Sequence, residues 1–308
     1  MNQVYNANGK ILLTGEYLVV DGAKALVLPL VFGQKLSVKN NPSVTNRITW
    51  KSFQLGNLWF QCEIDFEKLE IIKTTDEQIA EKLLRIFKEI IKVNRKVFHS
   101  EGGKEFETEL DFPQNWGWGS SSTLLVLLSQ WSGTDPFKLY FQLFSGSAYD
   151  IAAAYNTKPF FYWLQNNQPV IQETSFNPLF KDYLYFVFLG KKQLSEQEIK
   201  HYKLNYRPDR KLINRISEIS ENVAMCNELV QFERLITEHE EIMSCFLRRP
   251  SVKMEMFSDY AGGAIKSLGA WGGDFVLFTC FAGRKYLEEY LKGKNLFTCF
   301  NFSEIVSN

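Results

Sequence analysis

The spacing of apolar residues predicts a chain that mixes strands with helices. Alternating or continuous apolar runs predict strands over residues 3–39, 47–66, 106–110, 160–173, 183–189, 275–281 and 296–302. We expect hairpins over residues 47–66, with Gly56-Asn57 between the strands, and over residues 160–173. Apolar residues at spacings of three and four predict helices over residues 75–93, 120–131, 137–144, 150–154, 209–247 and 284–291, with Thr75-Asp76 as the expected cap of the first. Within the first strand region we expect Leu18–Val20 to be extended and the apolar run that begins at Ala25 to stop at Pro29.

Composition narrows the class of protein. The 308 residues, 45% apolar and 23% charged, are enough for one large or two ordinary globular domains. A formal net charge of zero, without long runs of one sign, argues against nucleic acid or an anionic membrane as the main partner. A soft boundary is expected near residues 174–182, where a hairpin gives way to a strand.

The cysteines and the first residues suggest a cytoplasmic protein. The five cysteines are scattered and no two have CxxC spacing, which favours reduced thiols. The beginning of the sequence has neither the basic flank nor the apolar core of a signal peptide. No apolar run approaches the length of a membrane span.

The stretch from Pro113 to Leu128 is the strongest candidate for chemistry. Gly117 and Gly119 lie in a loop, and Ser120–Ser122 follow at the start of an apolar helix. Free N–H groups and the helix dipole make such a helix start an anion site, and the glycines allow the backbone to approach a ligand. The pattern therefore suggests phosphate binding, although an ordinary capped helix with a flexible entry has the same pattern.

Two further segments contain small residues beside charged ones. Asp150 lies in the first turn of a helix that follows Ser145-Gly-Ser-Ala, and five glycines crowd residues 260–274. Lys10 precedes a buried-looking strand and Glu16 follows it. Taken singly, Lys10 and Glu16 are better explained as surface charges, and Asp150 as a common acidic first turn.

Taken in order, these segments resemble the GHMP kinase superfamily, which includes galactokinase, homoserine kinase, mevalonate kinase and phosphomevalonate kinase. The three family motifs match Asn8–Tyr17, Pro113–Ser121 and Ala264–Asp274. Glu16-Tyr17 looks like phosphomevalonate kinase, since mevalonate kinases usually have Glu-His there. The block Ala148-Tyr-Asp-Ile-Ala resembles a bacterial subgroup with a Gly-Tyr-Asp-Ile-Ala signature.

The resemblance implies an α+β, two-lobed GHMP kinase fold. Residues 1–178 would form an ATP-binding domain of ribosomal-protein-like α+β type. Residues 179–308 would form a ferredoxin-like α+β domain that returns the third glycine loop to the cleft between the lobes.

The resemblance also implies a role for each candidate residue. Asp150 and Lys10 would be catalytic, and Ser121 would hold Mg²⁺. The nucleotide would be bound by Gly117, Trp118, Gly119, Ser120, Ser121 and Ser122. The acceptor would be bound by Glu16, Ser147, Gly269, Ala270, Gly272 and Gly273.

The implied activity is transfer of the γ-phosphoryl group of ATP, with Mg²⁺, to a small acidic metabolite, with phosphomevalonate first. Mevalonate kinase, another GHMP kinase and an ATP-dependent decarboxylase of the same fold are alternatives. Trp118 stands where the family usually has Leu or Ile, and Trp271 where it has Gly. These indoles favour a further alternative, a binding protein without activity whose site is blocked. We expect a monomer or homodimer with a small-molecule substrate and neither nucleic acid nor membrane as partner.

Overall fold

The computed structural model describes residues 2–98, 102–190, 195–269, 271 and 274–307. Contacts divide the chain into two compact units. Unit 1 comprises Met1–Gly9, Phe32–Gln114 and Gly119–Phe144, and unit 2 comprises Lys10–Val31, Asn115–Trp118 and Ser145–Asn308. Each unit is built from several segments of the chain, so the division differs from the single boundary expected near residue 178. The reason is that β1 (Asn2–Leu12) and β2 (Ala25–Asn41) each begin in one unit and end in the other.

Unit 1 contains a mixed sheet. Its strands are β3 (Arg47–Gln54), β4 (Asn57–Asp65), β5 (Glu70–Thr74) and β6 (Gly103–Leu110), with the second half of β2. The order is β5-β4-β3-β6-β2, with β3 and β6 parallel and the β2–β6, β3–β4 and β4–β5 pairs antiparallel. The β3–β4 pair confirms the predicted hairpin over residues 47–66, with Gln54 opposite Asn57 at its turn.

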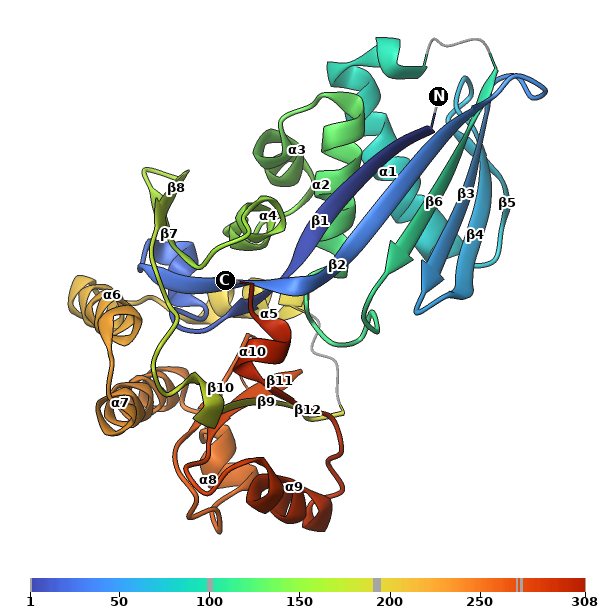
Figure 1. Ribbon diagram of the computed structural model, residues 1–308. Helices are drawn as coiled ribbons and strands as arrows, with labels where there is room; N and C mark the ends of the chain where they lie inside the picture. Colours follow the sequence, from blue (N-terminus) through green and yellow to red (C-terminus); the bar gives the residue numbers. More distant parts are fainter. Residues whose placement is uncertain (1, 99–101, 191–194, 270, 272–273, 308) are drawn as a thin grey trace. The chain divides into compact units, whose positions relative to one another are not determined.

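Three helices of unit 1 lie together against one face of this sheet (Figure 1). They are α1 (Glu77–Val93), α2 (Ser120–Ser132) and α3 (Pro136–Leu143). Asp76 caps α1 as expected, because its side chain accepts a hydrogen bond of 3.1 Å from the Ile79 amide. The ring of Trp131 meets that of Phe106 edge to face at 4.8 Å, which attaches α2 to β6 through the aromatic core.

Unit 2 has its own antiparallel sheet, ordered β10-β11-β9-β12. These strands are β9 (Leu184–Phe188), β10 (Ile265–Ser267), β11 (Phe275–Thr279) and β12 (Cys299–Asn301). The hairpin of β7 (Phe160–Gln165) and β8 (Gln168–Glu173) pairs with Ala25–Val27 at the beginning of β2. This confirms the hairpin expected over residues 160–173.

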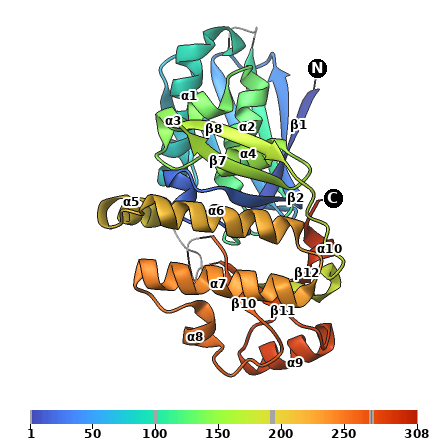
Figure 2. The ribbon, with the colours of Figure 1, turned by 90° about the vertical axis from the view of Figure 1, so that its left-hand side faces the viewer.

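The helices of unit 2 follow the sequence pattern in most places. They are α4 (Tyr149–Tyr155), α5 (Ser195–Asn205), α6 (Arg210–Met225), α7 (Leu229–Leu247), α8 (Val252–Met256), α9 (Arg284–Gly293) and α10 (Phe302–Ile305). Figure 2 shows α6 and α7 side by side. Their cores are the apolar stripes that predicted them, with Ile216, Ile219, Phe232 and Ile236 fully buried.

Two local predictions for the first strand region are wrong. Leu18–Asp21 is a short 3₁₀ helix and not a strand. β2 does not stop at Pro29, which lies between the residues that pair with β7 and those that pair with β6. A proline is tolerated there because its missing N–H removes no bond from either ladder.

All five cysteines are free thiols. Across the part of the chain that the structure describes, no helix has the length and apolar character that crossing a membrane requires.

Candidate functional site

The first turn of α2, in unit 1, has the features of an anion site. Gly119 is the N-cap, with φ 90° in the left-handed region, and no side chain caps the helix. The Ser122 hydroxyl instead donates 2.9 Å to the Gly119 carbonyl, so the first-turn N–H groups keep their capacity for a ligand. Ser121 is exposed, and its hydroxyl makes no hydrogen bond to any described residue.

Lys10 forms the centre of a charged cluster in unit 2. Its ammonium lies 5.4 Å from the centroid of the Tyr149 ring and hydrogen-bonds that side chain. Burial alone would lower the pKa of Lys10, but the neighbouring Tyr149, Asp150 and Asp274 outweigh burial and raise it. Lys10 is therefore a fixed cation with two carboxylates close by.

Gly117 lies directly against Asp274. A β-carbon built on Gly117 would stand 1.7 Å from Oδ2 of Asp274, and the φ of Gly117 is 69°. Only glycine fits this position without displacing the carboxylate. The backbone of Lys10 is held in the same region, because its amide donates 3.0 Å to the Trp118 carbonyl. The first, second and third motif segments therefore meet within unit 2.

Asp150 lies in the first turn of α4, as the sequence predicted. The residue before this helix, Ala148, has φ 64° in the left-handed region, and the Ile151 amide donates 3.1 Å to Oδ1 of Asp150. Ser147 is buried, and its carbonyl accepts a hydrogen bond from the Tyr162 hydroxyl. This bond holds the small-residue segment before α4 against β7.

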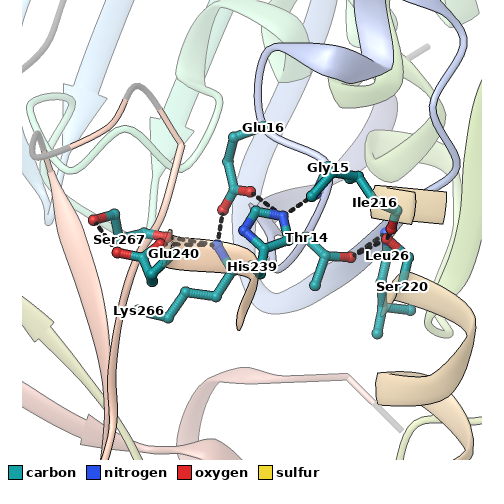
Figure 3. A network of polar contacts seen from close by, with 10 residues as sticks. All are labelled: Thr14, Gly15, Glu16, Leu26, Ile216, Ser220, His239, Glu240, Lys266 and Ser267. Carbon is teal, nitrogen blue, oxygen red and sulfur yellow. Dashed lines mark hydrogen bonds and ion pairs between the residues drawn. The ribbon is translucent and has the colours of Figure 1, made fainter. Parts of the chain in front are cut away.

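Glu16 is completely buried and lies in a network of ionisable groups (Figure 3). Its Oε1 accepts a bond of 2.5 Å from the Lys266 ammonium on β10. Its Oε2 lies 3.3 Å from Nε2 of His239 on α7. Lys266 also lies 3.6 Å from Oε1 of Glu240, whose other oxygen accepts 2.8 Å from the Ser267 hydroxyl.

Burial determines the protonation of this network. It raises the pKa of Glu16 to about 7, although Lys266 opposes the shift, and it raises the pKa of Glu240 as well. Burial and the charge of Lys266 hold the pKa of His239 well below its ordinary value. A neutral His239 agrees with its hydrogen bond, since Nε2 accepts 3.1 Å from the Gly15 amide.

Replacing Glu16 by glutamine is expected to flatten the pH dependence of stability on the acid side. A carboxyl with a raised pKa stabilises the folded state fully below its unfolded value near 4.5, and loses that contribution as the pH rises through about 7. The difference from wild type across this window is on the order of 3 kcal/mol. Urea unfolding at pH 5, 6, 7 and 8 measures it. His239 acts in the opposite sense in both proteins, so it cancels in the comparison. Parallel plots of the free energy of unfolding against pH for the two proteins would contradict the raised pKa of Glu16.

The two tryptophans of the motifs pack into the interior of unit 2. The Trp118 ring is 1% exposed and stacks on Phe275 with centroids 5.0 Å apart. Trp271 is 5% exposed, and its Nε1 donates 3.3 Å to the Pro250 carbonyl. Trp271 has φ 45°, in the left-handed region that glycine adopts more easily than tryptophan does.

The predicted residues fall in both units. Gly119, Ser120, Ser121 and Ser122 belong to unit 1, whereas Lys10, Glu16, Gly117, Trp118, Ser147, Asp150 and Gly269 belong to unit 2. Gly269 has φ 64° and open space around its missing side chain. Ala270, Gly272 and Gly273 lie outside the described residues. Among the residues that are described, no group of three His, Cys, Asp or Glu side chains could hold a metal ion.

Sequence reasoning gave no role to several residues of these clusters. They are Tyr149, His239, Glu240, Lys266 and Asp274. Tyr149, Lys266 and Asp274 had a usable signal, since each stands inside a motif segment. His239 had none, because it lies on a helix face that reads as an ordinary charged surface in the sequence.

Comparisons with known proteins show the fold. No protein-family model and no curated protein matches the chain. A solved mevalonate kinase matches with a TM-score of 0.70 at 14% identity, covering 97% of this chain and 98% of that one. Phosphomevalonate kinase of Streptococcus pneumoniae, in complex with phosphomevalonate and AMPPNP, matches with 0.67 at 14%, covering 97% and 99%. Galactokinase of Lactococcus lactis, complexed with galactose, matches with 0.66 at 15%, covering 100% and 95%. The chain therefore has the α+β fold of the GHMP kinases.

Proposed function

We propose that the protein is an ATP-dependent small-molecule kinase. The observation that carries this proposal is the Lys10 cluster. In it, one ammonium group has Tyr149, Asp150 and Asp274 as neighbours, and Asp274 lies directly against Gly117. Phosphoryl transfer needs positioning and neutralisation of charge more than covalent chemistry, and this cluster offers both. The fold shared with kinases for different acceptors supports the reaction class.

Each part of the candidate site has a proposed role. The N–H groups of Ser120–Ser122 would hold the phosphates of ATP at the positive end of α2, with the backbone at Gly117 and Gly119 close to the nucleotide. Lys10 would neutralise charge on the transferring group. Trp118 would contribute through its backbone, since its ring is buried.

Magnesium fits the donors at the start of α2. The exposed Ser121 hydroxyl makes no hydrogen bond to a described residue, and neutral oxygen donors of this kind suit Mg²⁺, which also keeps several of its waters. We infer that Ser121 would hold the ion. When bound, Mg²⁺ would supply charge neutralisation on the phosphates of ATP.

The role of Asp150 depends on the acceptor. For a hydroxyl acceptor such as mevalonate, Asp150 would take up the proton as general base. A phosphate monoester, with a second pKa near 6, is already largely ionised at neutral pH, so Asp150 would then orient it. We propose phosphomevalonate as the acceptor, because the pair Glu16-Tyr17 resembles phosphomevalonate kinase, and mevalonate as the alternative. The proposed contacts of the acceptor are Ser147, Gly269, Ala270, Gly272 and Gly273. Glu16 is buried, so it would act through its neighbours.

A panel of acceptors tests this proposal. ADP release from Mg·ATP is measured with phosphomevalonate, mevalonate, diphosphomevalonate, galactose and homoserine, together with release of CO₂. We expect acceptor-dependent ADP release with phosphomevalonate and none without acceptor. Release of CO₂ from diphosphomevalonate would identify a decarboxylase instead. ATP binding without turnover on any acceptor would support a binding protein, although the buried Trp118 and Trp271 rings weaken that alternative.

The cytoplasmic location and the monomeric or homodimeric state stay predictions.

A further inference from the structure

The turn after β1, residues 13–17, is attached to four neighbouring elements through buried polar contacts (Figure 3). The Thr14 hydroxyl donates 2.7 Å to that of Ser220 on α6 and accepts 3.1 Å from the Leu26 amide on β2. The Gly15 amide donates to His239 on α7, and Glu16 accepts from Lys266 on β10. A short turn with this many buried side-chain contacts has little freedom to move.

The turn after β1 and the residue Lys266 are each close in sequence to a member of the Lys10 cluster. Lys10, on β1, stands three residues before Leu13, where the turn begins. Lys266 stands three residues before Gly269, in the segment that leads to Asp274. The Lys266 ammonium also donates 2.9 Å to the Ser267 carbonyl, which ties it to its own strand. A shift of Lys266 would therefore reach both the turn and the glycine segment.

The charges of the network do not balance without a proton. Burial and the charge of Lys266 keep His239 neutral, in agreement with the bond that its Nε2 accepts from Gly15. Among the described residues, Lys266 is therefore the cation that faces the carboxyls of Glu16 and Glu240. Two buried carboxylates and one ammonium would leave a net negative charge, which is costly without water. Glu16 Oε2 and Glu240 Oε1 receive no hydrogen bond from a described residue, so either could hold the proton.

We propose that Glu16, His239, Glu240 and Lys266 form a positioning network whose shared proton sets the turn after β1 and, through it, the turnover of the site that contains Lys10. This inference rests on the proposed kinase function. The groups that act on Glu16 include Lys266 from β10, His239 and Glu240 from α7, Tyr149 from α4, and the neighbouring Tyr17 of the same turn. Burial raises the pKa of Glu16 to about 7, so the proton would be exchanged near neutral pH.

The pH profile of kcat for Glu16→Gln tests the network. Glutamine has the shape of glutamate but does not titrate. The change of kcat near pH 7 that we expect in the wild-type profile should therefore disappear in this variant, with KM for ATP changed less than about twofold. Glu241→Gln is the matched control, because Glu241 is an exposed residue of the same helix α7. A role in stability alone would lower Tm and leave the shape of the profile unchanged. An unchanged limb in Glu16→Gln, or its loss in the control, would overturn the inference.

Lys266→Met provides a readout that does not depend on activity. Loss of the cation is expected to lower Tm by about 10 °C and to speed hydrogen exchange of the Gly15 amide, which Lys266 does not touch. The double variant Glu16→Gln, Lys266→Met leaves Glu240 as the carboxyl of the network, and its raised pKa lets it hold the proton and stay neutral, so much of both losses should be recovered. If wild type transfers no phosphoryl group, the kinase function fails, and unchanged exchange at Gly15 in Lys266→Met would separately reject the positioning role.

Discussion

Lys10→Met is expected to lower kcat by about 10²–10³-fold, the effect of removing one charged group that stabilises a transition state. Methionine keeps much of the length and apolar character of lysine, so the packing against the Tyr149 ring is largely preserved. The cation that neutralises charge on the transferring phosphoryl group is lost, however. Steady-state kinetics with saturating ATP and acceptor measure the change. KM for the acceptor is expected to change by less than the turnover does.

Lys24→Met is the control for this prediction. Lys24 also lies over an aromatic ring in unit 2, with its ammonium 4.8 Å from the centroid of Trp163, but it pairs with Glu221 and has no proposed catalytic role. We expect Lys24→Met to keep turnover near the wild-type value. Equal losses in the two variants would show that general destabilisation, and not the charge of Lys10, controls the rate.

Asp150→Asn is expected to lower turnover by about 10²–10⁴-fold if the acceptor is a hydroxyl, the range for loss of a general base. A smaller loss is expected for a phosphate acceptor, which is already ionised. The affinity for ATP, measured by calorimetry, should be nearly unchanged, since the proposed phosphate contacts are the N–H groups of α2. The size of the loss therefore also indicates the type of acceptor.

Asp135→Asn is a matched acid-to-amide change at the beginning of another helix. Asp135 caps α3 through the amides of Phe137 and Lys138, and asparagine is an equally good cap. It should leave turnover and stability close to wild type. Near-normal turnover in Asp150→Asn, with Asp135→Asn behaving as expected, would remove Asp150 from the mechanism.

Local patterns predicted most of the elements, because each depends on residues close in sequence. Asp76 with its apolar stripe gave α1, and Gly56-Asn57 gave the β3–β4 turn. The sequence did not reveal β10, which is three residues long in a glycine-rich segment and exists because β11 pairs with it. Short strands of this kind are stabilised by partners that a local pattern does not contain.

The candidate site divides in the same way. Gly119 and Ser120–Ser122 could be found from one short segment, and the structure gives them the expected helix start. The environment of Glu16 could not, because His239 and Lys266 lie more than 200 positions away in sequence. Glu16 looked like a surface charge or an acceptor contact, and only the packed structure shows it buried with those partners.

³¹P NMR of the protein with Mg·ATP and phosphomevalonate tests the central claim most directly. The account predicts that the γ-phosphorus signal of ATP decreases while the signals of ADP and of a new diphosphate ester increase together. With mevalonate in place of phosphomevalonate, a phosphate monoester would appear instead and would change the acceptor but not the reaction class. An ATP spectrum that stays unchanged with every acceptor of the panel would contradict the kinase account.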